Sequence, residues 1–264
     1  MAVKLTSEGI LIYCTMAAYL AATVALMFNK NRLGWTVYTL GFAGAVITFM
    51  LRWHHVGHVP MQNLFEVFLC LGMLALPISL FCRRFMRVGG TAADCVIGFI
   101  VLFPAGFVFK AEPQKLPPAL QSGLFIPHVA AYMAAYMIMA KAGVQALGQF
   151  LGKDETGDGY LVSYELGVYK TVRLGFPLLT LGLILGAVWG KIAWGDYWNW
   201  DPKELWSFVS WLVYVGYFHF RYTSGRKYPR VNSAIVLSGL LTIVVTLLWV
   251  NLSTIFKGLH SYAS

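Results

Sequence analysis

The sequence predicts an all-α, polytopic integral membrane protein with about eight transmembrane helices. The chain has 264 residues, of which 58% are hydrophobic and 12% are charged, and its mean hydropathy is +0.66. Soluble globular proteins carry about 25% charged residues, so this chain has only half the usual charged surface. We therefore expect lipid to surround most of it, with no soluble domain of any size.

Eight apolar stretches account for this composition. A helix needs about 20 predominantly apolar residues to cross the hydrocarbon core of a bilayer. Windows of about this length lie at 9–28, 34–51, 64–82, 91–109, 124–148, 174–190, 205–220 and 233–250. The second, sixth and seventh are the short ones, and flanking aromatic residues extend them. Glu66 and Asp94 lie near the ends of their stretches, where a charge in a membrane helix costs least.

The connections between these stretches are short. The longest, 149–171, is too short for a separate core, so residues 1–264 are predicted to form a single transmembrane domain. The composition of this connection indicates a flexible loop followed by a short amphipathic lead-in, and a plain connector is the better explanation. The connection 110–123 contains three prolines and should run extended over the surface, because proline interrupts regular helix.

The distribution of basic residues predicts the orientation in the membrane. Thirteen of the 20 Lys and Arg residues lie in alternate connections, and the other seven lie in the remaining ones. Since connections rich in Lys and Arg face the cytoplasm, both termini and residues 191–204 are predicted to face outward. The net charge of +9 is therefore interpreted as a topology signal, and nucleic-acid binding is not expected.

The four cysteines exclude two classes of protein. Cys14, Cys70, Cys82 and Cys95 lie within or at the ends of apolar stretches, and none belongs to a C-x-x-C pair. We interpret them as small hydrophobic residues and not as disulfide partners or catalytic thiols. The chain is neither a thiol oxidoreductase nor a c-type cytochrome, because it lacks C-x-x-C-H.

The stretch W-G-D-Y-W-N-W-D-P-K-E, residues 194–204, concentrates aromatic and acidic side chains between two apolar stretches. Its end has the pattern of a helix start. Asp201 is predicted to cap the next helix, Pro202 suits the first helical position, and Glu204 completes a capping box. Residues 191–204 are therefore predicted to be an outer, tryptophan-rich segment that leads directly into the seventh membrane helix.

Six of the nine tryptophans lie between positions 189 and 211. For any one of them, an interfacial aromatic belt is the better explanation, but a belt distributes its aromatic residues over many helices. If the segment is locally helical, Trp194 and Trp198 share a face, and Gly195 leaves room for a ligand to approach the backbone. An aromatic surface of this kind suits a flat, apolar ligand with a polar edge, such as a porphyrin, a quinone or some lipids.

Histidine placement favours the porphyrin among these ligands. The chain has six histidines, and each alone is more often an ordinary packed or interfacial residue than a metal ligand. His128 opens the fifth stretch and His260 lies in the tail, so both are predicted at the outer surface. Two imidazoles at one level, before and after the tryptophan-rich segment, can supply both axial ligands of a haem iron. His58 lies at the start of the third stretch and His219 at the inner end of the seventh.

These motifs together resemble a known family. The tryptophan-rich segment is similar to the WWD signature of haem-handling proteins of cytochrome c maturation. Four further segments resemble the CcsA family, the membrane subunit of the system II cytochrome c synthase, called ResC or CcsB in some bacteria. They are G-H-V-P-M-Q-N-L-F-E at 57–66, P-H-V-A-A-Y-M at 127–133, W-S-F-V-S-W-L-V-Y with H-F-R at 206–221, and G-L-H-S-Y at 258–262. The resemblance covers nearly the whole chain from about residue 50 to the end.

The resemblance implies which residues bind haem b. The two outward histidines of the family, which ligate the haem iron beside the tryptophan-rich segment, match His128 and His260. The contacts of that segment correspond to Trp194, Gly195, Asp196, Trp198, Trp200, Asp201 and Glu204. Lys191 or Lys203 is a candidate partner for the haem propionates, on charge alone.

A second haem site is also implied by the resemblance. Two further histidines of the family, associated with membrane helices, match His58 and His219. His219 lies 13 residues after Trp206, or about 20 Å deeper on a straight helix, while His58 is expected near the outer end of its helix. One haem does not bridge that gap on a straight helix, so either the helix boundaries differ or the chain enters the membrane there as a re-entrant piece. His54 and His55 are alternative candidates for this site.

The resemblance implies a role in cytochrome c biogenesis. The expected reaction joins haem b to the C-x-x-C-H motif of apocytochrome c at the outer face of the membrane. It requires a ResB/Ccs1-type membrane subunit, so the chain would be an enzyme as part of a holocytochrome c synthase. The alternatives are a haem exporter or carrier without ligation, a b-type electron-transfer cytochrome, and a structural scaffold. We expect the bacterial inner membrane, with the haem site facing the periplasm, in preference to the thylakoid membrane.

Overall fold

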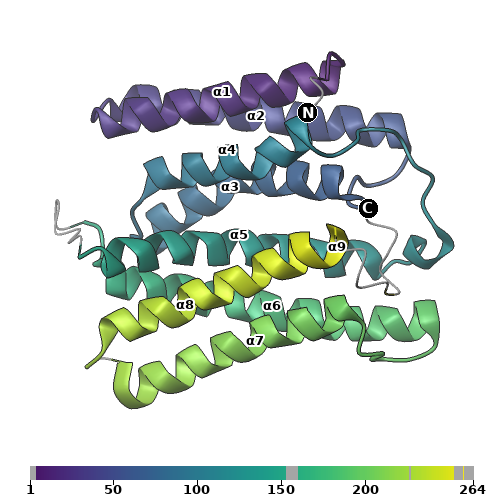
Figure 1. Cartoon of the computed structure of the whole chain (residues 1–264). Coiled ribbons are helices and arrows are strands. Elements are labelled where there is room, and N and C mark those ends of the chain that lie inside the picture. Colours follow the sequence, from purple (N-terminus) through teal and green to yellow (C-terminus); the bar gives the residue numbers. More distant parts are fainter. Residues whose placement is uncertain (1–3, 153–159, 226, 253–257, 259–264) are drawn as a thin grey trace. The chain divides into compact units, whose positions relative to one another are not determined.

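The computed structural model describes residues 4–152, 160–225, 227–252 and 258, and all regular secondary structure in these ranges is helical (Figure 1). The long helices are α1 (Ser7–Met27), α2 (Asn31–Val56), α3 (Leu64–Met86), α4 (Thr91–Phe107), α5 (Phe125–Phe150), α6 (Tyr164–Trp194), α7 (Pro202–Phe220) and α8 (Pro229–Val244). Short elements are η1 (Pro118–Leu120), the π-helices η2 (Arg221–Gly225) and η3 (Val245–Trp249), and α9 (Val250–Leu252). Each predicted apolar stretch overlaps one of the long helices, which confirms the all-α, polytopic fold class.

Several of these helices are suited to a bilayer by length and composition. Within the described ranges, the helices that are long and apolar enough to cross a membrane are Ser7–Met27, Asn31–Val56, Leu64–Met86, Tyr164–Trp194 and Pro229–Leu252. Thr91–Phe107 is also apolar but shorter. These features identify a multi-pass membrane protein.

The start of α6 differs from the sequence-based prediction. The helix begins at Tyr164, whereas the predicted stretch began at 174 and residues up to 171 were assigned to the preceding connection. Ser163 caps the helix, because its side chain accepts a hydrogen bond from the Leu166 backbone amide. A hydropathy window stops where polar residues begin, but a helix continues through them when its first turn is capped.

The described residues divide into two compact units. Unit 1 comprises Met1–Phe81 and Gly90–Pro117, and unit 2 comprises Cys82–Gly89 and Pro118–Ser264. Most of α3 therefore belongs to unit 1, while its last residues belong to unit 2.

Unit 1 is organised around the buried ring of Tyr19 on α1. A Cβ atom added to Gly41 of α2 would lie 2.7 Å from this ring, and one added to Gly98 of α4 would lie 2.6 Å from it. The Tyr19 hydroxyl donates a hydrogen bond to the Gly72 carbonyl of α3 at 3.0 Å. Small residues at helix interfaces are typical of membrane proteins, where close backbone approach replaces hydrophobic driving force.

Unit 1 also contains a buried arginine. The Arg52 side chain is only 1% exposed and donates from Nε and Nη2 to Glu66 Oε1 at 3.0 and 2.9 Å. Its Nη1 donates to the Ala111 carbonyl at 2.6 Å and lies 3.7 Å from Glu8 Oε2. Glu8 also contacts His55 Nδ1 at 2.7 Å. The arginine thus joins α1, α2, α3 and the segment after α4.

The predicted terminal positions of Glu66 and Asp94 are confirmed, since they lie in the first turns of α3 and α4. Both are buried and hydrogen-bonded. Asp94 Oδ2 accepts from Ser79 Oγ at 2.5 Å. None of the four cysteines, which all lie in the described ranges, forms a disulfide bond; Cys14 is exposed and the other three are buried.

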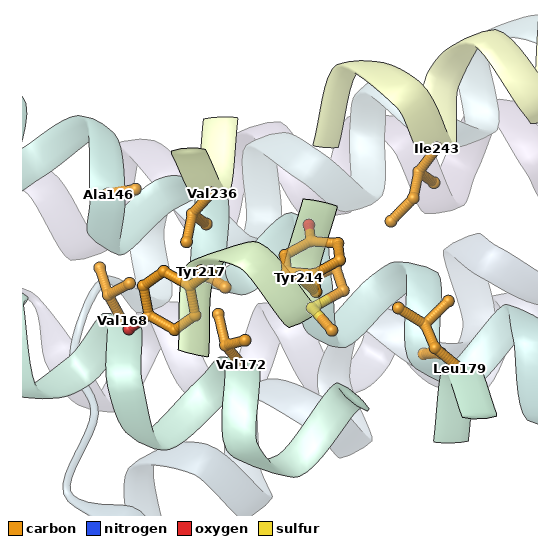
Figure 2. Close-up of a cluster of buried hydrophobic side chains, with 11 residues drawn as sticks. Ala146, Val168, Val172, Leu179, Tyr214, Tyr217, Val236 and Ile243 are labelled. Carbon is orange, nitrogen blue, oxygen red and sulfur yellow. The ribbon is translucent and has the colours of Figure 1, made fainter. Parts of the chain in front are cut away.

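In unit 2, α5 packs against α6 and α8, and α7 packs against α8 (Figure 1). Figure 2 shows the core of this unit. Tyr214 and Tyr217 of α7 lie between Val168 and Val172 of α6 and Val236 of α8. This packing fixes α6 and α7 in register and thereby positions the segment that joins them.

Candidate functional site

The tryptophan-rich segment is a structured turn between α6 and α7. α6 ends at Trp194, and Gly195 adopts the left-handed conformation, with φ of 93°, that commonly ends a helix. Asp201 Oδ1 accepts from the Lys203 amide at 2.9 Å, and Glu204 Oε2 accepts from the amides of Asn199 and Asp201 at 2.8 and 3.1 Å. The predicted capping box with Pro202 at the start of α7 is therefore confirmed.

The condition under which Trp194 and Trp198 were expected to share a helical face is not met. The residues between Gly195 and Asp201 are not helical, because the left-handed Gly195 ends α6. The Trp194 ring lies 4.8 Å from that of Trp189, whereas the Trp198 ring lies 6.0 Å from that of Phe208.

His128, in the first turn of α5, is held against α6. Its Nδ1 lies 2.9 Å from the Gly182 carbonyl, and its ring stacks on Trp189 at 5.6 Å with an interplanar angle of 26°. A Cβ atom at Gly186 would lie 2.6 Å from His128 Cε1, so only glycine admits the ring here. The Tyr132 ring meets it edge-on at 5.2 Å.

This arrangement selects a tautomer of the imidazole. A carbonyl oxygen can only accept, so Nδ1 carries a proton, and in the neutral ring Nε2 carries the lone pair. Histidines that ligate metals characteristically donate their other ring N–H to a backbone carbonyl or carboxylate, which fixes the ring orientation. His128 thus has the chemistry of a neutral imidazole ligand.

Trp189 anchors this side of the site. It is 1% exposed, and its Nε1 donates to the Ala119 carbonyl at 3.0 Å. Its ring lies between those of His128, Trp194 and Phe125, with centroid distances of 5.6, 4.8 and 6.0 Å. The prediction did not assign Trp189 to the site, although it belongs to the same cluster of six tryptophans.

A second feature of unit 2 is an apolar hollow of about 440 Å³. Its α6 wall consists of Thr180, Leu183, Ile184 and Ala187. Its aromatic wall consists of Trp198, Trp200, Phe208 and Trp211. Phe208 and Trp211 stack at 6.0 Å with an interplanar angle of 10°, and this volume is in the range of small-molecule sites.

His128 and the hollow lie on opposite faces of α6. An α-helix turns about 100° per residue, so the hollow-lining positions 180, 183, 184 and 187 share one face. Positions 182, 186 and 189, which contact His128, share the other. Position 194 lies two turns after Ala187, on the hollow face by helical position, but the Trp194 ring contacts Trp189 of the His128 face, whereas Trp198 and Trp200 line the hollow. This division could not be read from the sequence, because it depends on the turn at Gly195.

His260 lies outside the described residues. Gly258, two residues before it in the chain, is described, and a Cβ atom there would lie 2.0 Å from Asp201 Oδ2 and 3.1 Å from Pro202 Cδ. The tail backbone therefore contacts the cap of α7 at Gly258.

The other histidines are placed separately. His58 belongs to unit 1, where its Nδ1 lies 3.1 Å from the Val59 carbonyl and its Nε2 lies 3.3 Å from the Gln114 carbonyl. His219 belongs to unit 2 and is exposed in the last turn of α7. It lies at the opposite end of α7 from Pro202, about 25 Å along the helix axis. The pairing of His58 with His219 stays a prediction, and His54 and His55 are exposed near the end of α2.

The lysines beside the tryptophan-rich segment differ in environment. The Lys191 amine donates to the Gly195 carbonyl and lies 5.6 Å from the Tyr197 ring centroid. Lys203, before the predicted stretch 205–220, is partly buried. Burial lowers its pKa to about 8, and the nearby Asp201 carboxylate opposes this shift. Asp196 is exposed.

The fold and site define a class of multi-pass helical membrane proteins in which an aromatic-rich turn joins two helices beside a histidine fixed by a backbone carbonyl. The family described as Cytochrome C assembly protein matches residues 11–260. The chain belongs to this family.

Individual relatives agree with this assignment. The chain is 29% identical to "Cytochrome c biogenesis protein CcsA" of Pyropia yezoensis, with coverage of 94% of this chain and 93% of that protein. It is 32% identical to the protein of the same name from Prochlorococcus marinus (strain NATL1A), covering 81% of this chain and 79% of that one. Among solved structures, "Cytochrome c Heme Lyase CcmF" aligns with a TM-score of 0.66 and 16% identity. That alignment covers 94% of this chain and 48% of CcmF, and shows a common fold.

Proposed function

We propose that this protein binds haem b, delivers it to the outer face of the membrane and, with a partner subunit, promotes its attachment to apocytochrome c. Membership in the cytochrome c assembly family supports the general role. The names of the CcsA relatives, and the fold shared with a protein named as a haem lyase, are consistent with haem as the cargo.

The observation that carries this proposal is the setting of His128. Its Nδ1–H donates to the Gly182 carbonyl, which orients Nε2 as a ligand. Buried Trp189, which stacks on His128, and the ring of Trp194, which contacts Trp189, provide aromatic surface beside it. We propose His128 and His260 as the two axial ligands of the haem iron. The contact of Gly258 with Asp201 supports a tail that reaches this end of unit 2.

The arrangement around α6 indicates which tryptophans would contact the proposed haem. A porphyrin coordinated by His128 has Trp194 beside it, with Gly195 and Asp196 next in the chain. Trp198 and Trp200 line the opposite face of α6, so their proposed contribution is less direct. Asp201 and Glu204 hold the start of α7 through the capping box. Lys191 and Lys203 remain proposed partners for the propionates.

The proposed reaction requires little acid–base chemistry from the chain. Each cysteine thiol of the C-x-x-C-H motif adds across a haem vinyl group, forming one C–S bond and one C–H bond without net oxidation. Catalysis then depends on holding the vinyl carbons near the thiols, and such positioning can contribute about 7–11 kcal/mol to a barrier. The α6–α7 turn with its capping box, and His128 held against α6, are suited to this role.

The finer assignments form part of the same proposal. The partner is a ResB/Ccs1-type membrane subunit, and the second haem site uses His58 and His219. The location is a bacterial inner membrane with the haem site facing the periplasm, with the thylakoid membrane as the alternative.

The test is a haem spectrum of the purified protein. We expect low-spin bis-histidine bands in a His58→Ala, His219→Ala background, which lacks the proposed second site, and their loss when the His128→Ala, His260→Ala double variant is made in that background. Gly216→Ala is the control, because no atom lies within 4 Å of the added Cβ atom, and it should leave the bands unchanged. Bands that persist in the double variant place the iron ligands elsewhere and contradict the proposal.

Reconstitution with the partner subunit separates the rival functions. Haem that binds through His128 and His260 without thioether product indicates a carrier. Stable redox cycling with quinol and no transfer to apocytochrome c indicates a b-type cytochrome. Normal cytochrome c maturation by the double variant indicates a scaffold.

A further inference from the structure

The apolar hollow on the α7 side of α6 differs chemically from the His128 side. Among the described residues, its lining contains no charged side chain and no metal-ligating side chain. Its one hydroxyl, of Thr180, accepts from Trp211 Nε1 at 3.0 Å and donates to the Phe176 carbonyl at 3.0 Å. The described part of the lining thus offers no ligand for a metal, no cation for a carboxylate and no spare hydroxyl.

The location of the hollow points to the bilayer as the source of its occupant. Positions 180–187 lie 7 to 14 residues before the end of α6, or roughly 10 to 21 Å along the helix axis. That depth lies within the span of a helix across a hydrocarbon core of about 30 Å. The surface around the hollow is exposed and apolar, with Leu181 and Val188 on α6 and Leu205 and Leu212 on α7.

Trp200, which lines the hollow, has an unusual backbone conformation. Trp200 has a φ of 56°, which is uncommon for a residue other than glycine. Such conformations persist only where the surrounding structure enforces them, and they are concentrated at functional sites. The capping box of α7 starts one residue later, so the fold holds the Trp200 indole over the hollow although 69% of the residue remains exposed.

We propose that this hollow binds one acyl chain of a membrane phospholipid, and that the acyl chain packs against Trp198 and Trp200. An acyl chain requires only apolar contacts, and the lining supplies these. A porphyrin would leave its iron without a ligand and its propionates without a cation. This inference does not depend on haem binding at His128, which lies on the opposite face of α6.

The test uses phosphatidylcholine with dibrominated acyl chains, which quenches nearby tryptophans. The lipid is titrated into purified, delipidated full-length protein in detergent. We expect saturable quenching at about one lipid per protein, reduced by at least half in the Trp198→Phe, Trp200→Phe variant. The same loss is expected for Ala187→Phe, which fills the hollow. Leu181→Phe adds an aromatic ring outside the lining and is the matched control, which should quench like the wild type.

Two results overturn the proposal. Quenching that rises without saturation, and equally in Ala187→Phe, means that lipid contacts this surface only as bulk solvent. Displacement of the brominated lipid by stoichiometric metal-free protoporphyrin means that the hollow is a porphyrin site. Because the spectral test with His128→Ala and His260→Ala uses different residues, either proposal can fail while the other stands.

Discussion

Arg52 in unit 1 and His128 in unit 2 are polar side chains near helix ends of a membrane protein, but their surroundings differ. Arg52 is 1% exposed, is paired with Glu66 and Glu8, and donates to backbone carbonyls after α4. His128 is only partly buried and is held by a backbone carbonyl and by aromatic rings. A buried guanidinium with this many partners has a structural role, because it links α1, α2, α3 and the segment after α4. An imidazole that is held through Nδ1 can still use the lone pair of Nε2 to bind a metal.

Arg52 and His128 should also differ in what their removal changes: the stability of the fold for Arg52 and ligand binding for His128. Removing one partner of a buried ion pair leaves an uncompensated charge and destabilises the fold strongly. Removing a partly buried imidazole leaves no charge behind, so its loss affects mainly what it binds. The following predictions test this distinction, from the largest expected effect to the smallest.

The largest effect is expected for Arg52→Leu. Glu66 would then be a buried carboxylate without its cation, which costs about 3–5 kcal/mol. We expect a large drop in the unfolding midpoint in detergent and in the yield of folded protein. The Arg52→Leu, Glu66→Leu double variant removes both charges and should recover most of the loss. A double variant no more stable than the single one would show that Arg52 acts mainly through Glu8 and the carbonyls.

The second prediction concerns the His128 site and uses the variant Gly186→Ala. The added methyl would lie 2.6 Å from His128 Cε1, so the ring must leave its position against Trp189. Overpacking of this kind costs about 1–3 kcal/mol, and we expect haem absorbance to fall more than the unfolding midpoint does. Gly216→Ala in α7 is the matched control, because nothing lies within 4 Å of the added Cβ atom. Equal haem spectra for the two variants would contradict the proposed role of His128.

The sequence predicted the parts of the fold that depend on local physics. Apolar stretches of bilayer length coincided with the long helices, and Asp201, Pro202 and Glu204 form the predicted capping box. The early start of α6 was missed because Ser163 caps a polar first turn that a hydropathy window does not count. Local pattern therefore predicts where helices exist better than where they begin.

The candidate site was predictable in composition but not in geometry. The tryptophan cluster and His128 were singled out from the sequence. Their division between two faces of α6 depends on the turn at Gly195 and on the close approach of α5 at Gly182 and Gly186. Glycines four residues apart on α6 were the available signal for that approach, since small residues mark close helix contacts in membranes.

Asp201→Ala should have a smaller effect than either change above. The Asp201 carboxylate accepts from the Lys203 amide at 2.9 Å, and loss of an N-cap typically costs about 1 kcal/mol. We expect a modest decrease in the unfolding midpoint. Asp201→Asn keeps a side-chain oxygen acceptor and should retain most of the stability. If both variants lose stability equally, the charge of Asp201 matters more than its capping bond.

The smallest effect is expected from the titration of Lys203. Burial lowers its folded-state pKa to about 8, from the ordinary value of 10.5. Between these pH values the unfolded chain binds more protons than the folded one, so stability should rise as pH increases through this window. Solvent contact of the partly buried side chain reduces the size of this rise. Lys203→Met should abolish the rise between pH 8 and pH 10.5, measured as the unfolding midpoint against pH, while Lys227→Met, in the connection before α8, should keep it. If the unfolding midpoint of Lys203→Met rises with pH as steeply as that of the wild type, the Lys203 ammonium reaches solvent freely. This end of α7 is then less enclosed than the surroundings of Arg52.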